Sequence, residues 1–106
     1  MLVQPLPSLT DLALGLVTLH LYRRLPRGAA ASRYWRAAFA WSAVSALAGA
    51  VHHGYFVGSR WNDLSWAITS SIIVVTISFL LAATVIEVLG RSRAACLLYT
   101  SDAADE

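Results

Sequence analysis

The sequence predicts an all-α fold, a bundle of helices that crosses a membrane several times, and three observations support this prediction. Of its 106 residues, 58% are hydrophobic and only 13% are charged, with a mean hydropathy of +0.60, whereas a soluble globular chain has about 45–50% apolar and about 25% charged residues. Five of the eight arginines lie within residues 23–36, and residues 37–59 carry no charge. The uncharged stretch 64–86 is long enough to cross a hydrocarbon core of about 30 Å. An ordinary soluble domain is therefore excluded.

The C-terminal residues 96–106 differ from the rest of the chain. They contain three of the six acids and the only cysteine, and their order resembles the translation of a sequencing adapter. Read naturally, they would form a short solvated acidic tail. We expect a non-native tail, which is set aside before fold reasoning, and residues 1–95 then form a membrane domain with eight arginines and three acids, a net charge of +5. On this interpretation the chain is a fragment that has lost its natural C-terminal part.

The first helix is expected over about residues 9–25. Ser8 and Asp11 follow Pro7 in a Ser-x-x-Asp pattern, which predicts a helix start near Ser8 with the carboxylate close to the positive helix end. No basic segment precedes the apolar stretch, so we expect a membrane anchor in place of a cleaved signal peptide. His20 lies on the opposite side from Asp11 and is expected to reach toward the membrane surface.

The second helix is expected over about residues 34–53 and the third over about 63–89, with Gly54 and Gly90 as helix stops. Small side chains recur on one face of the second helix, which predicts close helix packing. They are Ser42, Ser45, Ala46, Gly49 and Ala50. The third helix carries a partly polar stripe that we expect to be buried in protein. It consists of Ser65, Thr69, Ile72, Thr76, Leu80, Ala83 and Glu87.

The distribution of arginines predicts the orientation. The first connection has five, the second has only Arg60, and Arg91 and Arg93 follow the third helix. Because arginines are retained on the cytoplasmic side, we expect the N-terminus outside and the arginine-rich loop inside, in the inner (plasma) membrane of a bacterium. This role in topology, near anionic lipid, explains the arginines without nucleic acid as a partner.

Four ionisable residues are expected at the outer end of the bundle: Asp11, His52, His53 and Asp63. Imidazoles and carboxylates at one depth are ligands for zinc or components of a proton-handling site. The simpler alternative is that both histidines only bond the last carbonyls of their helix. Adjacent histidines diverge by about 100° on a helix, which argues against one ion shared by His52 and His53.

Glu87 and Thr76 form a second candidate site toward the inner end. Acids at membrane depth are costly and often functional, so Glu87 is a candidate for an ion or proton path. The structural alternative has the hydroxyl groups bonding their own helix and Glu87 pairing with Arg91. No HExxH, GxSxG or phosphate-loop motif accompanies either site.

Three short motifs carry a resemblance: Leu9-Thr10-Asp11, Tyr34-Trp35 after the arginine loop, and the segment 48–55 with its His-His-Gly. They resemble an uncharacterised family of multi-pass bacterial membrane proteins, whose members have more than three helices and no established activity. A fainter resemblance is to the alkaline ceramidases and adiponectin receptors, seven-helix zinc hydrolases with a serine shortly before a histidine. Here the residue four positions before His52 is Ala48, and Ser45 lies one turn further away.

The sequence therefore predicts an integral membrane protein of unknown biochemical function. Two more specific hypotheses are a metal-dependent intramembrane hydrolase that uses His52 or His53 with Asp11, and a transporter of small solutes or protons that uses Glu87. Lipid is the expected partner, and missing C-terminal helices or a second copy are expected to cover the polar helix faces.

Overall fold

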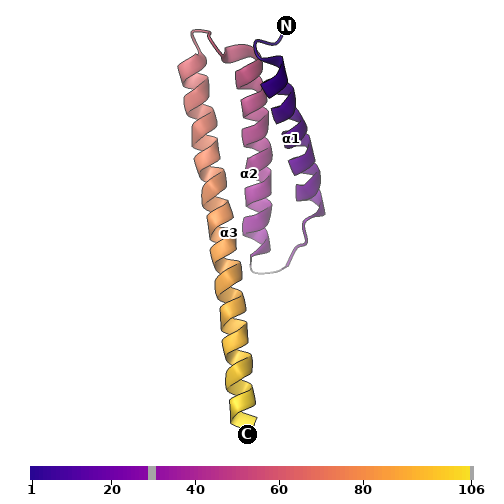
Figure 1. Cartoon of the computed structure of the whole chain (residues 1–106), viewed down its shortest axis with the longest axis vertical. Coiled ribbons are helices and arrows are strands. Elements are labelled where there is room, and N and C mark those ends of the chain that lie inside the picture. The colour runs from indigo at the N-terminus through magenta and orange to yellow at the C-terminus, as the bar shows by residue number, and fades with distance from the viewer. Residues whose placement is uncertain (29–30, 106) are drawn as a thin grey trace.

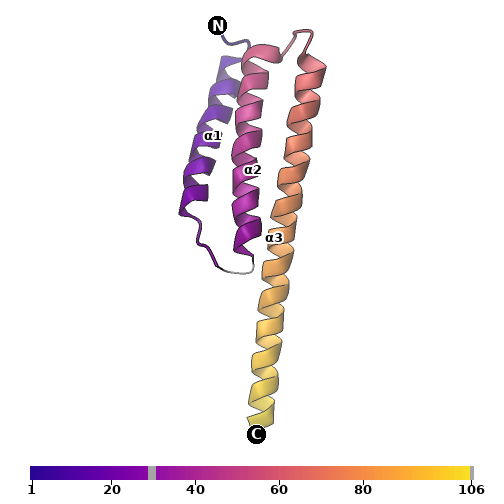
Figure 2. The same ribbon diagram turned by 180° about the vertical axis from the view of Figure 1, so that it is seen from behind.

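The computed structural model describes residues 1–28 and 31–105, with side chains for residues 1–28 and 31–90. Its elements are α1 (Pro5–Arg24), α2 (Ser32–Val51), a π-helical turn η1 (His52–Phe56) and α3 (Asn62–Asp105). The three long helices run alternately down, up and down, with α2 between α1 and α3 (Figure 1). The same order is seen from behind (Figure 2). The described part of the chain is thus all-helical, as predicted.

Helix α1 begins earlier than the Ser-x-x-Asp pattern predicts. Pro5 opens it, because proline has no N–H to leave unsatisfied and its φ already suits a first helical turn. Ser8 lies inside the helix, where its Oγ donates to the carbonyl of Ala50 at 2.7 Å. The prediction of a Ser8 cap with Asp11 in the first turn is therefore wrong, since the upstream proline fixes the start.

Neither predicted glycine stop ends its helix. Gly54 lies inside η1, where the N–H of Val57 donates to the carbonyl of His52 at 3.0 Å and the five-residue spacing defines a π-turn. Gly90 lies inside α3, because a helical glycine costs only about 1 kcal/mol relative to alanine and nothing there requires a positive φ. The glycines with positive φ are Gly28 and Gly58, both in connections.

The interfaces of α2 are built from small side chains, as predicted. Gly15 of α1 is so close to α2 that a Cβ there would lie 2.9 Å from Leu47 Cδ2. On the other side, Thr69, Thr76 and Ala83 are 4%, 6% and 0% exposed, so these three members of the predicted stripe are buried, whereas Leu80 of the same stripe is exposed. Small side chains let helix backbones approach closely.

Among the described residues, α3 is the one helix long and apolar enough to cross a membrane by itself, over Asn62–Gly90. Only 11% of its most apolar window is buried, which differs from the mostly buried core helix of a soluble protein. The predicted roles of Arg91 and Arg93 concern side chains that lie outside those described. The predicted non-native tail, residues 96–106, also lies beyond the described side chains and stays a prediction.

Candidate functional site

The N-terminal segment and the π-turn form one hydrogen-bonded unit at the end of the bundle that contains η1. The backbone N–H groups of Val3 and Gln4 donate to the carbonyls of Gly54 and His53, at 2.8 and 2.9 Å. Gly54 permits this approach, since a Cβ there would lie 3.0 Å from Leu2 Cδ2 and from Ser8 Oγ. The segment before α1 therefore fixes the position of the histidine pair.

Asp11 and His53, two members of the predicted outer cluster, lie close to each other. Nε2 of His53 is 3.9 Å from Oδ2 of Asp11, and the two side chains are 30% and 29% exposed. Nδ1 of His53 donates to Oε1 of Gln4 at 2.7 Å. Because an amide oxygen only accepts, this bond holds the proton on Nδ1 and leaves Nε2 of the neutral ring as an acceptor toward Asp11.

His52 points in another direction. It is 5% exposed, its Nδ1 is hydrogen-bonded to Oγ of Ser65 at 3.0 Å, and its ring lies 5.4 Å from that of Trp66. His52 therefore joins η1 to α3, while His53 joins η1 to α1. The two side chains point apart because adjacent residues on a helix differ in direction by about 100°.

Asp63 stays apart from this cluster. It is exposed in the first turn of α3, where it accepts from the side chain of Asn62 at 3.1 Å. Of the four predicted members, the structure thus brings Asp11 and His53 together. Within the described residues there is no group of three or more His, Cys, Asp or Glu side chains placed to hold a metal ion. The zinc hypothesis stays a prediction that requires further ligands.

The second candidate site is not gathered into one place. Thr76 donates to the carbonyl of Ile72 in its own helix at 3.0 Å, and eleven residues, about 16 Å along the axis, separate it from Glu87. Oε2 of Glu87 accepts from the indole Nε1 of Trp35 at 2.8 Å. Glu87 thereby ties α3 to α2 near the arginine-rich loop, and its predicted pairing with Arg91 lies outside the described side chains.

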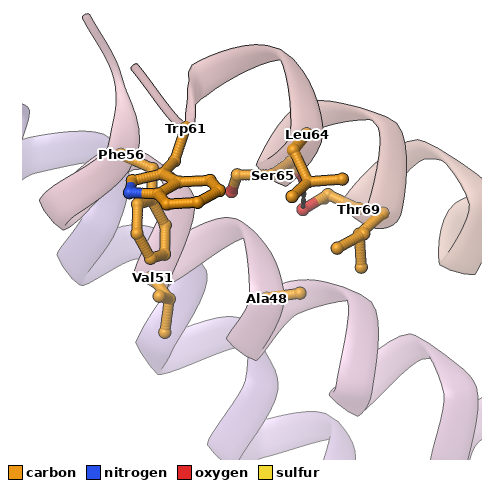
Figure 3. A pocket seen from close by; sticks show the side chains of 8 residues that line it. Ala48, Val51, Phe56, Trp61, Leu64, Ser65 and Thr69 are labelled. Carbon is orange, nitrogen blue, oxygen red and sulfur yellow. Dashed lines mark hydrogen bonds between the residues drawn. The ribbon is translucent and has the colours of Figure 1, made fainter. Parts of the chain in front are cut away.

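An apolar groove of about 340 Å³ lies between the end of α2 and the start of α3. Figure 3 shows Ala48 and Val51 on α2 facing α3, with the rings of Phe56 and Trp61 at one end. The two hydroxyl groups that line it are already engaged, because Ser65 Oγ bonds His52 and Thr69 Oγ1 donates to the Ser65 carbonyl at 2.9 Å. This groove offers apolar contact and no free reactive group.

A second, more polar cleft of about 290 Å³ opens on the other side of Thr69, between α1 and α3. Small residues of α2 form its floor, and Asp11 and His53 lie in its wall. The lining residues are Asp11, Leu14, Ser45, Ala46, Gly49, His53, Trp66, Thr69 and Ile73. Helices α1 and α3 do not contact each other, which is why this face of α2 remains open.

The sequence did not single out three polar partners: Gln4, which fixes the tautomer of His53, Ser65 as the partner of His52, and Trp35 as the partner of Glu87. Gln4 precedes the predicted first helix, and no local pattern links it to a residue 49 positions away. Trp35 carries a weak signal, because a buried indole N–H usually finds an acceptor. These pairs depend on the packing of helices.

Comparison with known proteins gives a family and no activity. No curated protein matches the chain, and neither does any solved structure. One protein family matches residues 6–101, which is most of the chain. This agrees with the predicted membership of an uncharacterised family, and the chain belongs to the family of unknown function DUF6962.

Proposed function

We propose that this chain is an integral membrane protein whose three helices all cross the bilayer. The observation that carries the proposal is the inverted arrangement of side chains. The buried hydrophobic residues are all alanines, among them Ala38 and Ala83 at 0% exposure, and no large side chain is fully buried among the described residues. Large apolar side chains face outward, with Leu6 at 76% and Leu81 at 63% exposure.

This arrangement of side chains is the opposite of the one found in proteins that fold in water. In water, the favourable free energy of folding comes mainly from burying large apolar side chains, at roughly 25 cal/mol per Å². In lipid that driving force between helices is absent, so association relies on close packing of small residues and on interhelical hydrogen bonds. The glycine and alanine contacts of α2 and the Ser8 to Ala50 bond are of these two kinds.

The helix lengths support three crossings. Helices α1 and α2 have 20 residues each, about 30 Å, which equals the thickness of the hydrocarbon core. Both are less apolar than α3, and α2 forms polar contacts with each of its neighbours, through the Ser8 to Ala50 bond with α1 and the Trp35 to Glu87 bond with α3. We propose that they cross as members of the bundle, and that further helices or a second copy cover the open face of α2.

The orientation is part of the proposal: the N-terminus and η1 outside, the arginine-rich loop in the cytoplasm, in a bacterial inner membrane. Arginines flank the loop end of both helices, with Arg23 and Arg24 in the last turn of α1 and Arg36 donating to the Leu25 carbonyl at 3.2 Å. Short loops rich in arginine are retained in the cytoplasm.

Labelling of single cysteines tests both the crossings and the orientation. In a Cys96→Ser background, Ser59→Cys places a thiol in the connection after η1 and Pro26→Cys places one in the arginine-rich loop. Intact cells treated with a membrane-impermeant maleimide should label position 59 and not position 26, and lysis should expose position 26.

Two results would overturn the proposal. Equal labelling of both positions in intact cells would mean that α2 does not cross the membrane. Recovery of the unmodified chain in the soluble fraction without detergent would mean that the chain is not an integral membrane protein. Labelling of position 26 alone would retain the crossings and reverse the orientation.

A further inference from the structure

We propose that the polar cleft between α1 and α3 binds a small organic ammonium ion, with the Asp11 carboxylate and His53 Nε2 as its acceptors. The cleft is formed by the packing of the helices against one another. Ammonium binding there therefore goes beyond the proposed membrane insertion and does not depend on it.

The Asp11 carboxylate is available to a cation. Its carboxylate lies directly over the backbone of α2, since a Cβ on Gly49 would be 2.7 Å from Oδ2. No side-chain or backbone donor among the described residues forms a hydrogen bond with it, and His53 Nε2 lies 3.9 Å from its Oδ2. A partly desolvated carboxylate without a donor favours the arrival of a cation.

The tautomer of His53 adds a second acceptor to the cleft. Gln4 Oε1 accepts from Nδ1, so the neutral ring turns a lone pair toward the carboxylate. Two acceptors then face one cleft with no proton between them. A primary ammonium group carries three N–H donors, so one group can donate to both.

The remaining lining residues suit the hydrocarbon part of an amine. The indole of Trp66 provides an aromatic surface of the kind that attracts cations, and Leu14 and Ile73 provide apolar contact for a hydrocarbon substituent. The volume of about 290 Å³ is at the lower end of the range for ligand pockets, roughly 300–1,000 Å³. The chemistry therefore fits a small primary amine with a short apolar or aromatic group.

The test is calorimetric titration of the full chain in detergent micelles with phenethylammonium, using 2-phenylethanol as the uncharged analogue and protein-free micelles as the blank. At about pH 8 the wild type should bind the ammonium about tenfold more tightly than the alcohol, or better, because charge-assisted bonds are the stronger ones. Should the chain prove water-soluble, the same titration is done without detergent.

Matched variants locate the site. Asp11→Asn should remove the preference for the ammonium, and Asp63→Asn, at the same end of the bundle but outside the cleft, should retain it. Circular dichroism of both variants shows whether the helices are intact.

Several results would overturn the proposal. One is equal affinity of the wild type for phenethylammonium and 2-phenylethanol, which needs no variant. Another is unchanged ammonium binding by Asp11→Asn. A third is Zn²⁺ binding that displaces the ammonium and is lost in Asp11→Asn, which would assign the pair to a metal ion.

Discussion

Arginines placed on the exposed face of α3 distinguish a membrane helix from a helix in water. Val74 and Ile77 are 63% and 57% exposed and lie near the middle of the apolar stretch Asn62–Gly90. Each is about 18–24 Å from either end of that stretch at about 1.5 Å per residue. An arginine side chain at either position is too deep to reach the membrane surface easily.

The magnitude follows from the composition of the helix. Residues 64–86 contain twelve Leu, Ile, Val and Phe residues, each contributing about −0.3 to −0.6 kcal/mol to insertion, about −4 to −7 kcal/mol together. Two central arginines cost about 5–7 kcal/mol, and the hydroxyl residues also oppose insertion. The double variant Val74→Arg/Ile77→Arg should therefore prevent α3 from crossing. In water, exposed substitutions change stability by no more than about 0.5 kcal/mol each.

Cys96, C-terminal to the apolar stretch, reports the outcome. In the wild type an impermeant maleimide should label it only after lysis, whereas in the double variant it should be labelled in intact cells. Val85→Arg/Val88→Arg is the matched control, because these exposed positions have the same spacing and lie close to the cytoplasmic end, where arginine is tolerated. Identical labelling of the two double variants would refute the reasoning.

Two further predictions concern the contacts between helices, and both are measured as the free energy of unfolding in mixed detergent micelles. Ser8→Ala removes the buried hydroxyl that donates to Ala50 and should destabilise the bundle by about 0.6–1.7 kcal/mol, whereas Ser71→Ala, whose exposed hydroxyl bonds its own helix, should have almost no effect; equal losses would mean that the interhelical bond contributes nothing. Ala83→Leu introduces a large side chain at a position that is 0% exposed and should cost about 1–3 kcal/mol by overpacking, whereas Ala67→Leu on the exposed face of the same helix should be neutral or favourable; a stable Ala83→Leu variant would contradict the close packing of α2 and α3.

Helix α3 shows how much of the fold local sequence can predict. Its uncharged apolar stretch is sufficient to define a long helix, and its hydroxyl stripe is sufficient to predict the buried face, because both depend on a helical period of 3.6 residues. The same reasoning located the small-residue face of α2. The predicted cap at Ser8 and the predicted stops at Gly54 and Gly90 are wrong. Whether a cap or stop motif ends a helix also depends on neighbouring residues that the motif does not include.

The candidate site shows where sequence reasoning ends. Asp11 and His53 could be named as members of one cluster because alternating helices return the chain to the same end of the bundle. Their separation from His52 followed from the angle between adjacent helical residues. The roles of Gln4 and Ser65 did not follow, because each depends on which faces two helices present to each other.

The amino-acid sequence alone determined the helices, the small and polar faces and the two ends where ionisable residues gather. These properties arise from interactions among residues a few positions apart and from the choice between apolar and polar side chains. The tertiary structure alone decided that Gln4 holds one tautomer of His53, that His52 bonds α3 and that Trp35 holds Glu87. Such pairings join residues up to 52 positions apart. A hydrogen bond forms only when the distance between donor and acceptor is correct to within a few tenths of an ångström, and that distance is set by how the helices pack.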